Sequence, residues 1–389
     1  MAEFVLNEFR GVFKRAEELY NEEKYKDAVP LFRDVVEHDR DNYIACYYLA
    51  DCLYYAKGTS RDYKKAFELF MIAASNKLTE ACYMVGLCYL EGTGINQDST
   101  QAVAWFTEAA KYAHPLSQYY LGVAYMKGEG ITKDIPRAAQ WLVHAAKEGI
   151  VDASRDAAIC YEALGKWRGA ATLYLDGAEK GDSYCQERIG DCYADGLGTL
   201  QSFELAMHYY TLAAEQGNVK AMVKMANKYL SDTTNKDALK NAIHWYMKAA
   251  NLGDSDAQNS LAECYYTGNG IFQNYQNAIL WWTKSANQGN RQAMIHLAEN
   301  YAEPDDPVVQ KDLKTAKFWW TKAAEAGDPF AMYKLGECYE LGLGVPQANL
   351  DDAYKWYRLA SQNGNEEATE AILKFTKSIS GKIKIKKQK

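Results

Sequence analysis

Two glycine-rich loops have the composition of turns that cradle phosphate groups. Their sequences are GTGINQD at residues 92–98 and GEGITKD at residues 128–134. Phosphate-binding loops of this kind follow a β-strand and supply a lysine to the phosphate oxygens. Here a helical pattern precedes each loop, and no lysine of the Walker type follows. We therefore interpret the glycines as turn residues with positive φ, and Asp98 and Asp134 as caps of the helices that come next.

Nine cysteines could support redox chemistry, but their spacing favours packing. Six of them occupy one recurrent position: Cys52, Cys88, Cys160, Cys192, Cys264 and Cys338. Cys46 and Cys52 lie six residues apart on one expected helix, as do Cys82 and Cys88, which separates their Cα atoms by about 9 Å. A disulfide requires about 7 Å or less. We expect nine reduced, buried thiols.

Other residues that could do chemistry do not form a recognisable catalytic or metal-binding set. The spacings CxxC and HExxH do not occur in the sequence. His208 and His244 share a repeat position, but neighbouring hairpins stack about 10 Å apart, which is too far for one zinc ion without further ligands. We therefore expect no catalytic residue, no metal, no cofactor and no enzymatic activity.

The elements that position these residues repeat along the chain. One copy comprises Gly86, Tyr89, Gly92, Gly94, Asp98, Ala102, Trp105, Ala109 and Ala110, and the same residue types recur 36 positions later. Apolar residues at helical spacing flank each glycine-rich loop, which predicts a helix, a turn and a second helix in every copy. Glycine in mid-helix costs about 1 kcal/mol against alanine, so Gly86 and Gly122 indicate close helix packing.

Composition and charge favour a cytoplasmic, helical protein. Apolar residues make up 48% of the chain, and only 7 of its 389 residues are proline. The first residues include acids and no uninterrupted apolar stretch, so we expect neither a signal peptide nor a membrane span. The net charge is −7, and residues 374–389 carry seven lysines and no acid, which leaves about −14 on the rest. We expect the tail from about Lys377 to be mobile and drawn to the acidic C-terminal half; the alternative is an end that is only disordered or solubilising.

The recurrent pattern resembles the Sel-1-like repeat family, and two shorter units resemble tetratricopeptide repeats. The resemblance implies an all-α fold, a right-handed α-solenoid of about ten helix-turn-helix repeats whose first helices line a concave groove. The chain then divides into a leader at 1–8, a tetratricopeptide-like repeat at 9–42, three Sel-1-like repeats at 43–150, a short tetratricopeptide-like unit at 151–182, five Sel-1-like repeats at 183–365, a capping helix at 366–376 and a basic flexible tail at 377–389.

The tetratricopeptide pattern, carried over, predicts which residues of each first helix line the groove. In the N-terminal half they form an aromatic and aliphatic strip that a monomer should not leave exposed. The strip consists of Tyr47, Tyr54, Tyr83, Leu87, Leu90, Tyr119, Val123 and Met126. In the C-terminal half the expected groove residues are mostly acidic: Glu187, Asp191, Glu263, Glu299, Tyr333, Glu337 and Glu340.

These residues predict a non-catalytic scaffold or adaptor that holds a partner protein or peptide in its groove, the partner having an apolar and a basic segment. Two alternatives stay open, a regulatory subunit that activates an enzyme and a hydrolase on a repeat scaffold. Binding of nucleic acid would depend on the basic tail alone, because an acidic array repels phosphate, and is disfavoured. We expect no membrane partner, and the sequence leaves the oligomeric state open.

Overall fold

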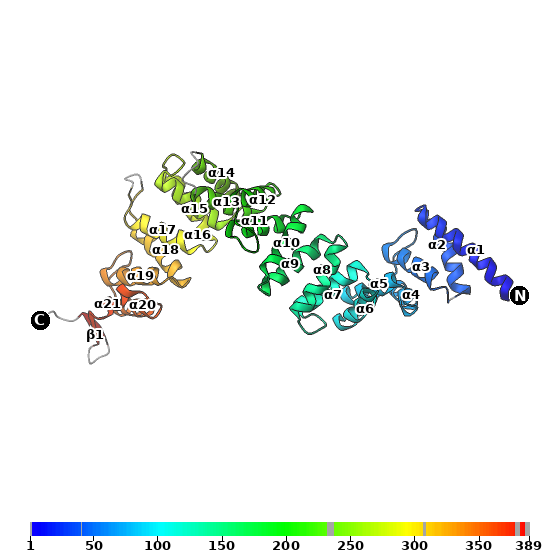
Figure 1. Cartoon of the computed structure of the whole chain (residues 1–389). Helices are drawn as coiled ribbons and strands as arrows, with labels where there is room; N and C mark the ends of the chain where they lie inside the picture. Colours follow the sequence, from blue (N-terminus) through cyan, green and yellow to red (C-terminus); the bar gives the residue numbers. More distant parts are fainter. Residues whose placement is uncertain (1, 40, 232–236, 306–308, 378–381, 386–389) are drawn as a thin grey trace. The chain divides into compact units, whose positions relative to one another are not determined.

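The structure, a computed structural model, describes the chain except for residues 1, 40, 232–236, 306–308, 378–381 and 386–389 and the side chains of residues 2–9 and 377. The chain forms two compact units, residues 1–209 and 210–389. The boundary falls inside helix α12 (Phe203–Glu215). Figure 1 shows that the helices of each unit follow one another as successive pairs.

The first unit contains α1 (Ala2–Asn21), α2 (Tyr25–His38), α3 (Tyr43–Tyr55), α4 (Tyr63–Ser75), α5 (Thr79–Glu91), α6 (Ser99–Lys111), α7 (Pro115–Lys127), α8 (Ile135–Lys147), α9 (Val151–Ala163), α10 (Trp167–Glu179) and α11 (Ser183–Asp195). The second unit contains α13 (Val219–Ser231), α14 (Ala238–Asn251), α15 (Ser255–Thr267), α16 (Tyr275–Asn287), α17 (Arg291–Ala302), α18 (Leu313–Glu325), α19 (Pro329–Leu341), α20 (Leu350–Gln362) and α21 (Glu366–Ile372), and strands β1 (Phe375–Lys377) and β2 (Ile383–Ile385).

Each helix packs against the next, from α1 to α11 in the first unit and from α13 to α21 in the second. Helices that pack mainly against their neighbours in sequence are the arrangement of a repeat array. The predicted all-α solenoid of helix-turn-helix repeats is therefore confirmed. Its core joins many buried alanines to one large buried side chain in each second helix, such as Phe106, Leu142 or Tyr357.

The recurrent small residue lies where the two helices of a hairpin cross. A Cβ atom added at Gly122 would lie 2.6 Å from Leu142 Cγ, and one added at Gly86 would lie 2.6 Å from the ring of Phe106. Real Cβ atoms do not approach so closely, so the crossings exclude any larger residue unless the neighbour moves. The close packing predicted for Gly86 and Gly122 is confirmed.

The glycine-rich loops serve as turns that end one helix and start the next. Gly92 has φ of +74° and ends α5 in the left-handed region. Asp98 then accepts hydrogen bonds from the backbone N–H groups of Thr100 and Gln101, at 2.9 and 3.0 Å, and so caps α6. Asp134 caps α8 in the same way through Arg137. The predicted roles of the glycines and both aspartates are confirmed.

Both ends of the chain differ from expectation. The leader expected at 1–8 is part of α1, which begins at Ala2. The expected capping helix at 366–376 ends at Ile372, because Phe375–Lys377 pairs antiparallel with Ile383–Ile385, inside the tail expected to be flexible from 377. In β2, isoleucine and lysine alternate, so that their side chains point to opposite faces of the strand. Ile383 points inward and is only 8% exposed, and β2 packs on α20. Residues 378–381 and 386–389 of the predicted tail lie outside the described residues.

Candidate functional site

The expected apolar strip of the first unit is largely covered by the array itself. Tyr54 and Leu87 are buried, with 9% and 8% of their surface exposed. The remaining strip residues are half-buried: Tyr47, Tyr83, Leu90, Tyr119, Val123 and Met126. The expectation of an exposed apolar strip is therefore wrong at Tyr54 and Leu87. The ring of Tyr54 lies against Tyr63 and Phe70 of the second helix of its own hairpin.

The tyrosines of this strip have partners inside the fold. The ring of Tyr47 lies 5.8 Å from that of Phe70, on the second helix of the same hairpin. Tyr54 donates a hydrogen bond from its hydroxyl to Glu91, at 3.2 Å, and Tyr119 donates to Asp156, at 3.3 Å. Each of these contacts joins a hairpin to itself or to the next one, so the rings contribute to cohesion of the array.

The expected acidic residues of the first unit are engaged as well. Glu187 is buried, with 2% of its surface exposed. Asp191 accepts a hydrogen bond from the guanidinium group of Arg188 at 2.6 Å, and the same guanidinium also pairs with Glu162 at 2.7 Å. A carboxylate already paired with arginine has little attraction left for a basic ligand. Asp191 is therefore already compensated, and Glu187 is shielded from solvent.

In the second unit, the structure brings Glu299 and Glu337 together in one cavity of about 420 Å³. Three consecutive hairpins contribute to its lining, from α15 to just beyond α19. The lining residues are Tyr266, Trp282, His296, Glu299, Asn300, Ala302, Glu303, Asp305, Leu313, Ala316, Trp320, Lys334, Glu337, Cys338 and Leu343. Four carboxylates and one lysine thus surround a space that also has three aromatic rings in its wall.

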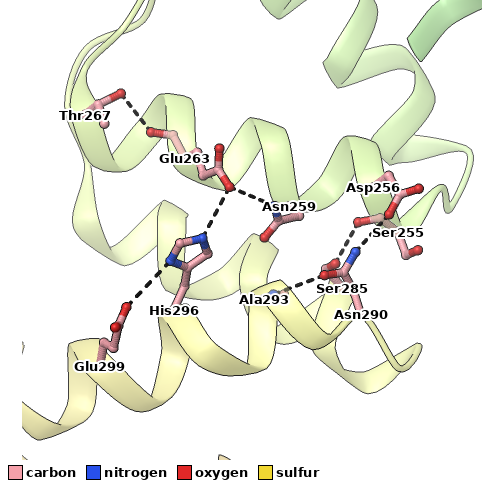
Figure 2. A network of polar contacts seen from close by, with 10 residues as sticks. All are labelled: Ser255, Asp256, Asn259, Glu263, Thr267, Ser285, Asn290, Ala293, His296 and Glu299. Carbon is pink, nitrogen blue, oxygen red and sulfur yellow. Dashed lines mark hydrogen bonds and ion pairs between the residues drawn. The ribbon is translucent and has the colours of Figure 1, made fainter. Parts of the chain in front are cut away.

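His296 links two of these hairpins at the cavity wall, as Figure 2 shows. Its Nε2 atom lies 3.3 Å from Oε1 of Glu263, and its Nδ1 atom lies 3.9 Å from Oε2 of Glu299. Glu263 Oε1 also accepts a hydrogen bond from Asn259 Nδ2 at 2.8 Å. The hydrogen bond and charge of His296, together with the Asn259 bond, lower the pKa of Glu263. Glu263 therefore supports His296 and does not itself line the cavity.

Further contacts in Figure 2 hold α15 in register with the elements that follow it. Ser285 donates its hydroxyl hydrogen to the backbone oxygen of Ser255 at 2.6 Å. Asn290 donates through Nδ2 to Asp256 at 2.9 Å, while its oxygen caps α17 at Ala293. These bonds fix the position of α17, which presents Glu299 and Asn300 to the cavity.

Aromatic rings and a lysine that pairs with a glutamate also form part of the cavity wall. The rings of Trp282 and His296 stack with centroids 4.9 Å apart, and Tyr266 donates its hydroxyl hydrogen to Asp305. Lys334 pairs with Glu337 at 2.8 Å. Glu337 also accepts the hydroxyl hydrogen of Tyr333, and burial and this bond raise the pKa of Tyr333 to about 12. Glu299 and Glu303 are exposed carboxylates in the same wall.

The remaining expected residue, Glu340, has a structural partner. It accepts a hydrogen bond from the hydroxyl of Tyr357 at 2.6 Å, and this bond, after burial, raises the pKa of Tyr357. Cys338 borders the cavity, but burial raises the pKa of its thiol to about 11, so it is a poor nucleophile at neutral pH. Among the described residues, no group of three or more His, Cys, Asp and Glu side chains is placed to bind a metal.

Sequence reasoning had identified Glu299 and Glu337 but missed most of their surroundings. Two signals were available for the rest. Tryptophan occurs as a doublet only at residues 281–282 and 319–320, and the second member of each doublet, Trp282 or Trp320, lines the cavity. The loop that carries Glu303 and Asp305 is two residues longer than its equivalents and is rich in acids.

The stacked hairpins define the class of protein, an α-solenoid repeat protein with a candidate binding cavity between consecutive repeats. A family model, the Sel1 repeat, matches residues 44–78, 79–111, 115–150, 183–218, 219–254, 255–290, 291–328 and 329–365. Because these matches cover well over half of the chain, the protein belongs to the Sel1 repeat family. Proteins of this family generally act as scaffolds for protein interactions and are generally not catalytic.

The chain is also similar to solved structures. One is the crystal structure of c5321, a protective antigen of uropathogenic Escherichia coli strains with an SLR fold: it is 28% identical, has a TM-score of 0.75, and the match covers 94% of this chain and 79% of that chain. Another is a Sel1 repeat protein from Oxalobacter formigenes, 24% identical with a TM-score of 0.48, with 88% and 89% covered. No curated protein matches the chain significantly.

The described part of the chain contains no candidate membrane-spanning helix. None of the helices there is both long and apolar enough to cross a membrane.

Proposed function

We propose that this protein is a non-catalytic scaffold that binds a basic segment of a partner protein at the cavity formed by residues 255–365. The observation that carries the proposal is the composition of the cavity wall, in which Glu299, Glu303 and Asp305 are exposed carboxylates and the one lysine, Lys334, already pairs with Glu337. Carboxylates of one sign around a concave space attract a cationic ligand and orient it.

The geometry of the wall supports a protein ligand in particular. The cavity lies within the range of about 300–1,000 Å³ that is typical of ligand sites. Its acids come from α17, α19 and the loop after α17, so that a ligand must contact more than one hairpin to reach all of them. The half-buried ring of Tyr266 offers apolar surface beside the charges, which suits a segment with both basic and apolar residues.

The proposal is tested with a labelled short peptide of arginine, lysine and leucine and with a matched peptide in which glutamate replaces both basic residues. Fluorescence anisotropy should detect binding of the basic peptide only, with an affinity that falls as salt is added. The double variant Glu299→Gln with Glu303→Gln should weaken binding by about tenfold or more, because it removes two carboxylates of the wall.

Glu325→Gln is the matched control, since Glu325 is exposed on α18 and is absent from the cavity wall. This variant should bind the basic peptide as the unmodified chain does. Equal binding of the basic and acidic peptides, or unchanged binding to the double variant, would show that the cavity is not the site.

We also propose a cytoplasmic location for the scaffold. All nine cysteines are buried and unbonded to one another, which is the state expected in a reducing compartment. Fractionation of the native host cells with antibody detection tests this proposal, and recovery of the protein outside the cytoplasm would contradict it.

A further inference from the structure

Two buried polar atoms in the cavity residues have no hydrogen-bond partner. They are Oδ1 of Asn300, whose residue is 5% exposed, and Nε1 of Trp282, whose residue is 2% exposed. Both residues line the cavity. A buried polar atom without a partner costs about 1–3 kcal/mol, so such atoms are rare in folded proteins and call for an explanation, such as a bound water, ion or ligand. One of the two is an acceptor and the other is a donor.

The acceptors of the wall surround the space from several directions. Glu299 and Asn300 come from α17 and Asp305 from the loop that follows, whereas the oxygens of Glu337 on α19 already accept from Tyr333 and Lys334. Lysine presents three donors from a single point, whereas arginine presents five donors in a planar fork that reaches separate acceptors. A wall with acceptors on two separate elements is therefore better satisfied by a guanidinium group than by an ammonium group.

The unpartnered donor, Trp282 Nε1, favours a peptide over a small guanidinium compound as the ligand. A bare guanidinium group donates hydrogen bonds but accepts none. An arginine within a peptide adds backbone carbonyl oxygens, which can accept from Trp282 Nε1. Both unpartnered atoms lack solvent exposure, so their engagement requires each side chain to rotate towards the cavity.

From these contacts we infer that the cavity is a recognition pocket for one arginine side chain of a partner peptide, and that it selects arginine over lysine. Asn300 accepts from the guanidinium group, the carboxylates of Glu299, Glu303 and Asp305 balance its charge, and Trp282 donates to the peptide backbone. This inference rests on the proposed function, because it names the residue through which the basic segment is held.

The test uses three labelled peptides that differ only at one central position, occupied by arginine, lysine or citrulline. Citrulline keeps the shape of arginine and removes its charge. Arginine should bind best, and the other two should bind at least about tenfold more weakly, as expected for the loss of one charge-assisted hydrogen bond. N-acetyl-arginine amide should compete more strongly than guanidinium chloride at equal concentration and ionic strength, because it carries the carbonyl oxygens that guanidinium lacks.

A second arm uses Asn300→Leu, which keeps side-chain size and removes the unpartnered acceptor. The variant should lose the preference for arginine over lysine, yet its melting temperature without peptide should rise, because a cost of folding has been removed and leucine favours helix more than asparagine does. Asn287→Leu is the matched control, because Asn287 is exposed at the end of α16 and outside the cavity wall. It should leave the arginine preference unchanged.

The outcomes separate this inference from the proposed function. Equal affinity for the arginine and lysine peptides, both lost in the variant with Glu299→Gln and Glu303→Gln, would overturn the arginine pocket and leave the basic-segment scaffold standing. An Asn300→Leu chain that melts at a lower temperature and still prefers arginine would assign Asn300 a purely structural role and also overturn the pocket. Guanidinium chloride that competes as well as N-acetyl-arginine amide would overturn the peptide contact.

Discussion

Gly122 and Leu142 meet at the crossing of α7 and α8, where a Cβ atom on Gly122 would lie 2.6 Å from Leu142 Cγ and 3.2 Å from the Leu142 backbone nitrogen. The second distance involves backbone, so the two helices cannot accommodate a larger residue by turning one side chain. The pair sets how closely this hairpin closes, and the repeat pattern places similar contacts in other hairpins, such as Gly86 with Phe106.

Substitution of Gly122 should therefore destabilise the fold. Gly122→Leu should lower the free energy of unfolding by about 1–3 kcal/mol, the usual cost of overpacking. Gly11→Ala provides a control, because Gly11 lies in helix α1 with nothing within 4 Å of an added Cβ, and it should be neutral or slightly stabilising. Urea unfolding followed by circular dichroism measures both, and equal effects of the two substitutions would contradict the crossing.

The cysteines should resist thiol reagents while the protein is folded. Burial raises the pKa of Cys88, Cys264 and Cys338 to about 11, so few thiolates exist at neutral pH and those thiols are covered. Labelling by Ellman's reagent should be slow in buffer and should reach nine thiols per chain in denaturant. Rapid labelling of the native protein, or fewer than nine thiols in non-reducing denaturant, would count against this description.

Buried tyrosines should make the array sensitive to alkali. Burial raises the pKa of Tyr47 and Tyr54 to about 12, against about 10 in an unfolded chain. Because the folded state favours the neutral phenol, this stability is fully present below pH 10 and is lost as pH rises towards 12. Unfolding free energy measured by urea titration at several alkaline pH values should show this loss, and Tyr47→Phe should make it smaller. An identical pH dependence in the Tyr47→Phe variant would exclude the tyrosine contribution.

The C-terminal hairpin should act as a cover for the last repeat. Ile383 is 8% exposed and its backbone N–H donates to Asp351 at 3.1 Å, whereas Ile385 on the same strand is 51% exposed. Ile383→Ala should lower the free energy of unfolding by about 1–3 kcal/mol through lost burial. Ile385→Ala should change it by no more than about 0.5 kcal/mol. If thermal melts of the two variants coincide, the strand does not cover the core.

The sequence determined the features of this protein that depend on short spacings. The 36-residue recurrence placed the helices, and Asp98 and Gly92 marked their ends, because capping and left-handed turns involve residues only a few positions apart. The mid-helix glycines indicated close crossings for the same reason, since each hairpin folds on itself. The eightfold repetition also made the family resemblance visible.

Only the tertiary structure decided how much of each first helix is exposed. Leu87 and Glu187 occupy expected groove positions and are nevertheless buried, because their exposure depends on the distance between consecutive hairpins and not on spacing within one. The antiparallel pairing of β1 with β2 likewise depends on tertiary structure, because β2 packs on α20 and buries Ile383.

The cavity shows the same division. The repeat pattern predicted Glu299 and Glu337. It did not predict the other lining residues, such as Trp282 on α16, Asn300 on α17 and Asp305 in the long loop after α17. A repeat pattern describes what the hairpins have in common, whereas a pocket between hairpins depends on the residues in which they differ and on their packing. The charge of the site was therefore visible in the sequence, and its shape and its unpartnered atoms were decided by the fold.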